Sequence, residues 1–497
     1  MDDAPVVQAR DGAVRGTRHD RVSVFRGIPY ATAHRFSPPV PAAAWAGELD
    51  ATAFGPIAPQ VAGAQFQRAD LVQDEQCLTL NVWTPGADDA RRPVMVWIHG
   101  GAFRTGSGAS PLYDGTTLAA RGDVVVITMN YRLGALGFLA HPALATADGE
   151  PCGSWGMLDC TLALHWVQAN AGAFGGDPGD VTVFGESAGA AAVALLCTMP
   201  MARGLFHKAV VQSGAPLTST LAAGAHLAEG LAARLGVADV PALRDVPVAA
   251  LLRAQLEVEQ EQPDRAFIPV VDGVAIPELP IKALGAGSAA GIPTLVGTNV
   301  DEWKLWAPGD PHSRDLDEAR LRRRLERAFP IEAIDGVIDT VRAARDERGE
   351  GTAPNDVFYA VESDRAFRVH ALRMAEAQAP HAPTFVYLFE WRSPALGGWL
   401  GACHGLEIAF VFGNQGRGEL AAFTGDGPEA DALAERMMDA WLAFARSGDP
   451  STPALPWPTY DTTTRPTMVF GRSSRLEDAP RDAERAAIDA VLPRQSG

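Results

Sequence analysis

The sequence contains no uninterrupted apolar run of the about 18 residues that a transmembrane helix requires. Its apolar run Ala188–Leu196 is too short and too rich in alanine. The N-terminal residues Met1–Pro5 lack the basic region and the apolar stretch of a secretory signal. We therefore expect a protein without a membrane anchor that stays in the cytoplasm.

Cysteine is also scarce, with five among 497 residues. The number is odd and the spacings match no zinc-binding pattern, so neither a disulfide framework nor a zinc site is expected. Cys152 and Cys160 could pair, but reduced and mostly buried thiols are the expectation for a cytoplasmic protein. The cysteines are Cys77, Cys152, Cys160, Cys197 and Cys403.

Basic side chains are too few to balance the acidic ones. Lysine and arginine number 42 against 60 aspartates and glutamates, which gives a net charge of −18. Nucleic acids and anionic membranes are both bound through basic patches, so this balance argues against either partner. We expect a small-molecule substrate as the partner, and a monomer or small homo-oligomer.

Short apolar runs alternate with helical patterns along the chain, whose 47% hydrophobic and 21% charged residues suit a large globular core. Apolar runs without polar alternation indicate strands buried on both faces. Helical spacing recurs in residues 158–166 and in 433–444, the latter between Pro428 and Gly448. This alternation predicts an α/β fold with a mostly parallel sheet. The predicted strands are Val94–Ile98, Val124–Thr128, Val181–Phe184, Ala209–Gln212, Thr294–Val296 and Phe385–Phe389.

Two stretches, residues 216–290 and 304–382, interrupt this alternation. Both are mostly helical in pattern and rich in Ala, Leu, Arg and Glu. Length alone would allow several domains, but large single-sheet α/β enzymes also reach this size. We interpret the two stretches as insertions that cover the carboxyl edge of the sheet within a single domain of residues 1–497.

The strongest motif is Gly185-Glu-Ser187-Ala-Gly189, which follows a predicted strand and precedes a helical run of small residues. This strand–turn–helix context distinguishes a nucleophile elbow from chance occurrences of G-x-S-x-G. Glycines on either side of the serine leave room for strand and helix to cross, and the turn lifts the hydroxyl above the sheet. The N-terminus of the helix favours developing negative charge at the same place. Ser187 is therefore the candidate nucleophile.

A glycine-rich loop, His99-Gly-Gly-Ala102, follows another apolar strand. Alone it could be a flexible turn. Together with the elbow it fits a loop whose backbone N–H groups hold the oxyanion of a tetrahedral intermediate. We assign the donors as the N–H groups of Gly101, Ala102 and Ala188, and give His99 a structural role.

A serine hydroxyl needs a base to take its proton, and with this elbow the chain order is serine, acid, histidine. His404 lies in a glycine-bounded loop beyond the predicted strand 385–389, where an exposed imidazole belongs. His312 lies in an ordinary polar turn, His370 on a helix, and His381 at the start of a strand. His404 is therefore the candidate base.

The acid should follow a further strand. Asp301 and Glu302 stand side by side just past the predicted strand 294–296. The bare sequence does not choose between them, and both could be surface acids of a loop.

These residues together resemble the type-B carboxylesterases, the family that includes cholinesterases and bacterial para-nitrobenzyl esterases. Phe174–Gly189 is similar to the family's serine signature, and the resemblance extends over nearly the whole chain. The other matching segments are Phe25–Ala31, Glu75–Trp83, Asn130–Phe138, Gly297–Glu302, His404–Glu407 and Trp457–Tyr460.

The resemblance implies the α/β-hydrolase fold, in which a mostly parallel twisted sheet is flanked by helices and helical insertions cap the active site. It implies that Glu302 is the acid, and it supports the three oxyanion donors named above. It also suggests a carboxylate pair, with Glu186 beside the nucleophile and Glu407 after the histidine. Two carboxylates in a partly dry site would raise at least one pKa.

The sequence departs from the family pattern at a few positions. Gln76 stands where an acid or glycine is usual, and Cys77 has no upstream cysteine, so the disulfide of secreted animal members cannot form. The third position of the oxyanion loop is Ala102 rather than glycine, as in para-nitrobenzyl esterases. Related loops accept bulky alcohols, so esters of tertiary alcohols are possible substrates.

The resemblance and the motifs predict a serine carboxylesterase that works through an acyl-enzyme and needs no metal or organic cofactor. Phe103, Trp303 and Leu400 flank the catalytic loops and are candidate pocket residues, with core packing as the alternative. A carbamate or amide hydrolase or a lipase could use the same triad. A non-catalytic adhesion protein is disfavoured because serine and histidine are retained, and a dehydrogenase because its G-x-G-x-x-G pattern is missing.

Overall fold

The computed structural model forms two compact units, Met1–Val210 with Pro216–Ile292, and Val211–Ala215 with Pro293–Gly497. Met1–Asp3, which belong to the segment where the sequence predicts no secretory signal, lie outside the described residues. The single domain expected from the sequence stays a prediction. The described residues are 4–61, 68, 70–145, 147, 149–261, 266–312 and 314–493.

The first unit is built on a sheet whose neighbouring strands follow the order β11-β9-β10-β8-β4-β3. β11, β9 and β10 are parallel, and β8, β4 and β3 continue the sheet antiparallel. The three strands predicted here are confirmed. The bounds are β3 Thr17–His19, β4 Val22–Pro29, β8 Thr79–Thr84, β9 Arg92–Ile98, β10 Val125–Met129 and β11 Gly176–Glu186. A small separate sheet joins β1 Val6–Ala9, β2 Gly12–Arg15 and β7 Glu48–Asp50.

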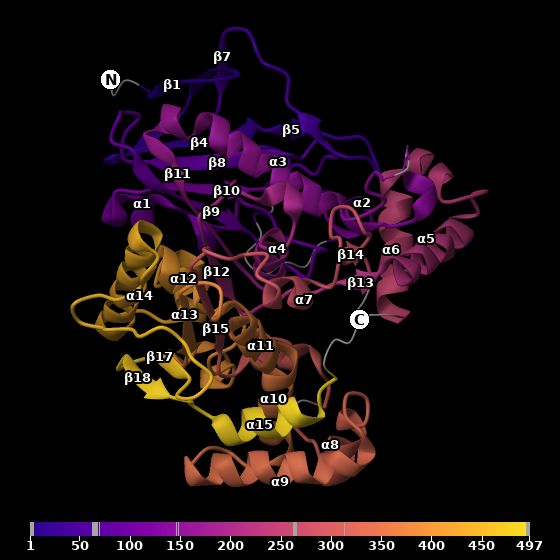
Figure 1. Ribbon diagram of the computed structural model, residues 1–497, viewed down its shortest axis with the longest axis vertical. Helices are drawn as coiled ribbons and strands as arrows, with labels where there is room; N and C mark the ends of the chain where they lie inside the picture. Colours follow the sequence, from indigo (N-terminus) through magenta and orange to yellow (C-terminus); the bar gives the residue numbers. More distant parts are fainter. Residues whose placement is uncertain are drawn as a thin grey trace. The chain divides into compact units, whose positions relative to one another are not determined.

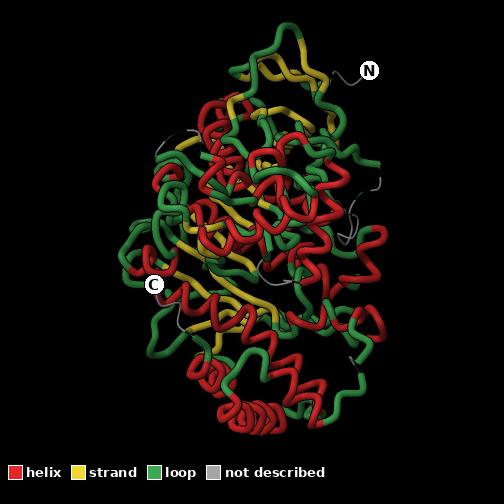
Figure 2. The backbone as a smooth tube through the Cα atoms, turned by 90° about the vertical axis from the view of Figure 1, so that its right-hand side faces the viewer, coloured by secondary structure: helices red, strands yellow, loops and turns green. Residues whose placement is uncertain are grey.

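Helices lie beside the strands of this unit in the ribbon of Figure 1 and in the backbone tube of Figure 2. They include α1 (Thr116–Gly122), α3 (Trp155–Asn170) and α4 (Ala188–Leu196). The sequence predicts one apolar face on α3, but the helix is buried around most of its circumference, including the polar side chain of Asp159. β8 and β10 are buried at every position, which explains their unbroken apolar runs.

An ion pair between Arg132 and Asp159 lies inside this core. Asp159 is 0% exposed, and its two oxygens accept bonds from the guanidinium at 2.7 and 2.8 Å. The same guanidinium donates to the backbone oxygens of His34 and Ser37. One arginine therefore joins α3 to the chain that precedes β8.

The second unit has the strand order β15-β16-β17-β18, of which the first three are parallel and β18 is antiparallel. The predicted helix after Pro428 is confirmed as α14, which ends before Gly448 at a φ of 77°. β12 (Lys208–Gln212) crosses the boundary between the units. The bounds are β15 Thr294–Asn299, β16 Thr384–Phe389, β17 Pro466–Phe470, β18 Arg475–Asp478, α12 Ile408–Phe412, α14 Pro428–Ser447 and α15 Asp482–Val491.

The two stretches interpreted as insertions are largely helical. In the part that the structure describes, residues 216–290 hold three α-helices and a short strand pair, and residues 304–382 hold four α-helices. A π-helical segment at Asp364–Arg368 also lies in the second stretch and has no signal in the sequence. Their role as a cap stays a prediction. The helices are α5 Leu221–Leu235, α6 Val248–Glu261, α7 Pro280–Gly285, α8 Glu318–Leu325, α9 Ile331–Glu347, α10 Pro354–Ser363 and α11 Val369–Gln378.

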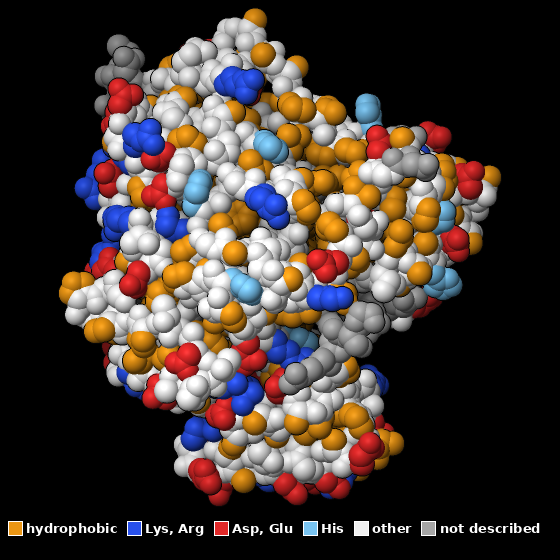
Figure 3. Space-filling model, viewed as in Figure 1, with side chains coloured by type: hydrophobic (Ala, Val, Ile, Leu, Met, Phe, Trp, Pro, Cys, Tyr) orange, Lys and Arg blue, Asp and Glu red, His pale blue; other side chains and the backbone are white. Residues whose placement is uncertain are grey.

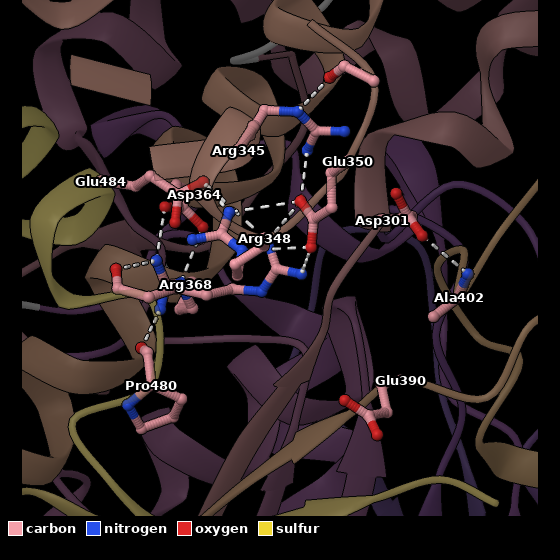
Figure 4. A network of polar contacts seen from close by, with 12 residues as sticks. Asp301, Arg345, Arg348, Glu350, Asp364, Arg368, Glu390, Ala402, Pro480 and Glu484 are labelled. Atoms are coloured by element: carbon pink, nitrogen blue, oxygen red, sulfur yellow. Dashed lines mark hydrogen bonds and ion pairs between the residues drawn. The ribbon is translucent and has the colours of Figure 1, made fainter. Parts of the chain in front are cut away.

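A network of charged side chains attaches α15 to α9 (Figure 4). Arg348 donates to Glu484 at 2.6 Å, and Arg481 donates to Glu350 at 2.5 Å. Burial alone would raise the pKa of Glu350, but the two guanidiniums lower it to about 2. The last helix is thereby fixed to the second unit by alternating charges.

All five cysteines are free and buried, as expected. No helix in the described part of the chain is long and apolar enough to cross a bilayer. On the face shown in Figure 3, acidic side chains are interspersed with basic ones.

Breaking the buried pair should destabilise the protein. Asp159→Asn leaves the Arg132 charge uncompensated, and we expect the free energy of unfolding to fall by about 3–5 kcal/mol. Asp70→Asn, in an exposed pair with Arg68, is the control and should cost less than about 1 kcal/mol. Urea unfolding measures both; similar small losses would contradict the role given to Asp159.

Candidate active site

Ser187 occupies the turn between β11 and α4, with φ 57° and ψ −123°. A non-glycine residue at positive φ is strained, and such strain concentrates at functional sites. A Cβ at Gly189 would lie 2.0 Å from the backbone oxygen of Ile98, and one at Gly185 would lie 2.6 Å from the carbonyl carbon of Gly189. The steric reason inferred for both glycines is therefore confirmed.

The parallel register of β9 and β11 brings the glycine-rich loop beside the serine. Ile98 is the register partner of Gly185, so both strands end at the same edge of the sheet. A Cβ at Gly100 would lie 3.0 Å from the Cβ of Ser187 and 2.9 Å from Oε2 of Glu186. The loop, Ser187 and the buried Glu186 therefore lie close together within the first unit.

The loop after Gly100 has an unusual backbone. Gly101, Ala102 and Phe103 follow one another with φ values of 112°, 55° and 59°. Backbone strain of this kind, at residues that are not glycine, is typical of functional sites. Ala102 is exposed and Ala188 opens α4, so the candidate oxyanion donors lie at a strained loop and at a helix N-terminus.

Phe103 anchors this loop from behind. Its side chain is 1% exposed and packs edge-on against Phe138 at 4.9 Å, and its oxygen accepts the N–H of Gly134 at 2.7 Å. Gln255 on α6 accepts the next N–H, that of Ala135, at 2.8 Å. Phe103 therefore has a packing role, and its place in a pocket stays a prediction.

His99 is not suited to act as a base. Burial lowers its pKa to about 4, its Nδ1 lies 2.8 Å from the oxygen of Gly100, and its ring stacks on Tyr131 at 4.5 Å. A neutral, enclosed imidazole of this kind supports the structural role given to it.

The second unit joins Glu302 to His404. Oε2 of Glu302 lies 2.6 Å from Nδ1 of the imidazole, and the two side chains are 0% and 6% exposed. The second carboxylate oxygen accepts the N–H of Asn299 at 2.8 Å. Of the two acids that the sequence left open, Glu302 is the one that contacts the imidazole.

The side chain of Asp301 contacts Ala402 and Lys304. Its carboxylate accepts the N–H of Ala402 at 3.0 Å and pairs with Lys304 at 2.8 Å. Burial would raise the pKa of Asp301, but the Lys304 ammonium outweighs it and holds the pKa below its ordinary value.

Aromatic rings surround the imidazole, and two of them were missed from the sequence. Trp306 and Phe367 lie 5.1 and 4.6 Å from the His404 ring between centroids, and Trp306 remains 44% exposed. Trp303, an expected pocket residue, lies 5.1 Å from Trp306. Trp306 follows Glu302 closely and could have been found, whereas Phe367 lies on the π-helical segment far along the chain.

Glu407 is 0% exposed below the acid–base pair. Asn299 donates to its Oε2 at 2.6 Å and Gln212 to its Oε1 at 3.3 Å. Burial, aided by the charge of Glu302, raises the pKa of Glu407 to about 7. The carboxyl group therefore changes its protonation near neutral pH.

The candidate residues fall into two groups, one in each unit. Leu400, 6% exposed, lies in the loop that carries the histidine. Among the described residues, no cluster of three His, Cys, Asp or Glu side chains is arranged to hold a metal. The first unit holds Gly101, Ala102, Phe103, Glu186, Ser187 and Ala188; the second holds Glu302, Trp303, Leu400, His404 and Glu407.

Comparison with known proteins gives consistent matches over nearly the whole chain. The model of the carboxylesterase family matches residues 3–487. Para-nitrobenzyl esterase of Bacillus subtilis is 37% identical, over 97% of this chain and 98% of its own. Phenmedipham hydrolase of Pseudarthrobacter oxydans is 36% identical, over 94% of this chain and 95% of its own. A solved carboxylesterase of Geobacillus stearothermophilus superposes with a TM-score of 0.85 at 40% identity, over 97% of this chain and 99% of that one.

The pKa of Glu407 makes stability depend on pH. The pKa of Glu407 is about 7 in the folded protein and 4.5 in an ordinary glutamate. Protonated Glu407 therefore contributes its full stabilisation of the fold below pH 4.5, and this contribution is lost as the pH rises through about 7. We expect this group to remove on the order of 3 kcal/mol from the free energy of unfolding between those limits. Glu407→Gln should show a correspondingly flatter profile in urea unfolding, unlike the exposed-acid control Glu429→Gln. Parallel profiles for wild type and Glu407→Gln would refute the assignment.

Proposed function

Because the chain belongs to the carboxylesterase family, we propose that Ser187, His404 and Glu302 are the triad with which it hydrolyses carboxylic esters. It is a serine carboxylesterase with the α/β-hydrolase fold, in agreement with its curated and solved relatives. The triad residues are proposed on the geometry of each unit and on the motifs.

The reaction runs in two halves. His404 takes the proton of Ser187 while the serine oxygen attacks the ester carbonyl, and then gives that proton to the leaving alcohol. Water, activated by the same imidazole, attacks the acyl-enzyme and releases the acid. Glu302 holds the imidazole in one tautomer and stabilises its positive charge.

The observation that carries this proposal is the hydrogen bond between Nδ1 of His404 and Oε2 of Glu302. An acceptor at Nδ1 keeps the proton of a neutral imidazole on that nitrogen, so Nε2 is the atom that acts as base. Both oxygens of Glu302 are hydrogen-bonded in a buried site, which fixes the direction of the imidazole.

The oxyanion is proposed to bind the N–H groups of Gly101, Ala102 and Ala188. The contact between the loop and Ser187, and the positive φ values of the loop, support this assignment. Each such donor typically contributes about 3 kcal/mol of transition-state stabilisation.

The substrates are proposed to be small esters that carry an aromatic group. Trp306 presents a partly exposed ring beside the imidazole, and offset stacking on such a ring contributes roughly 1 kcal/mol. The name of the Bacillus subtilis relative, para-nitrobenzyl esterase, points to the same substrate class. A carbamate or amide hydrolase or a lipase is not favoured over an esterase.

A cytoplasmic location is also proposed. Five buried free thiols suit a reducing compartment, where disulfides are not maintained.

The triad can be tested by single substitutions. Ser187→Ala should lower kcat by about 10³-fold or more, and Glu302→Gln by about 10²–10⁴-fold, because the base loses its orientation. Asp301→Asn is the matched control for the acid and should cost about tenfold at most. Steady-state turnover of an activated ester gives these values. Unchanged turnover in Ser187→Ala, or a greater loss in Asp301→Asn than in Glu302→Gln, would overturn the assignment.

The role of Trp306 can be tested with benzyl and ethyl esters of one acid. Trp306→Ala should raise KM about tenfold for the benzyl ester and change it less than about threefold for the ethyl ester. Trp306→Phe should retain the preference, and Ile331→Ala, an exposed residue of α9, serves as control. Equal changes for both esters would remove the aromatic ring from substrate recognition.

A further inference from the structure

Hydrogen bonds join the loop that carries His404 to the loop that carries Glu302. They are made by the residues that precede His404 and by those that precede Glu302. The N–H of Asp301 donates to the oxygen of Ala402 at 3.0 Å, and the N–H of Ala402 donates back to Oδ2 of Asp301 at 3.0 Å. The side-chain amide of Asn299 donates to the oxygen of Cys403 at 2.8 Å. The relative position of Glu302 and His404 therefore depends on these neighbouring hydrogen bonds as well as on the bond between the two side chains.

Asp301 has a special place in this attachment because its backbone and its side chain both bond to Ala402. Figure 4 shows the carboxylate directed at that residue. Gly401 has a φ of 59°, and a Cβ there would lie 2.2 Å from Oδ2 of Asp301. The histidine loop therefore passes close against this carboxylate, and the position of the carboxylate decides where the loop runs.

Lys304 fixes that position. Its ammonium lies 2.8 Å from Oδ1 of Asp301, and the two side chains are only 10% and 12% exposed. Removing one partner of such a pair leaves an uncompensated charge in a site poor in water, whereas replacing both by neutral groups can be almost neutral. The ion pair can therefore be tested in two ways: one partner can be removed, or both can be replaced by neutral side chains.

We propose that Asp301 and Lys304 are a positioning pair that holds the His404 loop at the distance from Glu302 required for proton transfer. This inference rests on the proposed function of His404 and Glu302. Neither residue of the pair touches substrate. A displacement of about 1 Å in a catalytic group can cost on the order of 10²-fold in rate, so the pair acts on kcat rather than on substrate affinity.

Three variants of the full-length protein test the proposal. Asp301→Ala removes the carboxylate, and the double variant Asp301→Asn with Lys304→Gln replaces the ion pair by a neutral one that still offers an oxygen to Ala402. Asp489→Asn breaks another partly buried ion pair of the same unit, with Arg373 at 2.7 Å, and is the control for destabilisation alone.

Two readouts separate positioning from general stability. The first is kcat and KM for an activated ester. The second is the strongly deshielded proton NMR signal of the proton between Nδ1 of His404 and Glu302, which reports the geometry of that bond.

We expect Asp301→Ala to lower kcat about tenfold or more with KM within about twofold, and to shift or broaden the proton signal. The double variant should restore kcat to within about threefold and restore the signal. Asp489→Asn should change neither. Wild-type kcat and signal in Asp301→Ala, or the same changes in Asp489→Asn, would overturn the proposal.

If Asp301→Ala does not fold, Lys304→Gln makes the same distinction, because it removes the ammonium that fixes the carboxylate and leaves Asp301 itself unchanged. A lower kcat with an altered signal then supports the positioning pair, and wild-type values refute it. Failure of the proposed function looks different: Ser187→Ala would then retain activity, whatever the outcome at Asp301.

Discussion

The close crossing of β11 and α4 over the end of β9 is the constraint on which the rest of the first unit depends. The backbone of Gly189 approaches the oxygen of Ile98 so closely that no side chain fits between them. The chain can make this crossing only through a turn in which Ser187 has a positive φ. Ser187 occupies this strained turn, and the parallel register of β9 and β11 brings the loop of Gly101 and Ala102 to the same edge of the sheet.

In the second unit, three carboxylates near one imidazole have different tasks because their surroundings differ. Glu302 contacts the ring. Asp301 is neutralised by Lys304 and holds the backbone of the histidine loop. Glu407 accepts hydrogen bonds from two neutral amides, those of Asn299 and Gln212, and burial raises its pKa to about 7. Different environments give neighbouring carboxylates different pKa values, so that they can have different roles within one site.

Much of this arrangement could be predicted from local sequence. Unbroken apolar runs marked the central strands, and paired glycines marked the elbow, because both patterns reflect sterics within a few residues. The choice between Asp301 and Glu302 could not be made from the bare residues, since adjacent side chains point in opposite directions and only the fold says which one meets His404. The family resemblance made that choice, and in the structure Glu302 is the acid whose carboxylate contacts the imidazole.

Features that depend on distant packing were not predictable. Phe367 reaches the imidazole from a π-helical segment that has no sequence signal, and Gln255 on α6 accepts the N–H of Ala135, whose neighbour Gly134 bonds to the oxygen of Phe103. The helix α3 was expected to have one apolar face and is instead buried around most of its surface, because the ion pair of Asp159 and Arg132 satisfies its polar side. Local periodicity carries no information on such partners.

The proposed function requires that the hydroxyl, the imidazole and the backbone amides act on one reacting carbonyl. A crystal structure of the protein after reaction with an alkyl phosphonate ester, which mimics the tetrahedral intermediate, tests it most directly. The account predicts phosphorus bonded to Oγ of Ser187, its oxygen within about 3 Å of the N–H groups of Gly101, Ala102 and Ala188, and Nε2 of His404 within hydrogen-bond distance of the adduct. Phosphorus on another residue, or an imidazole directed away from the adduct, would contradict it.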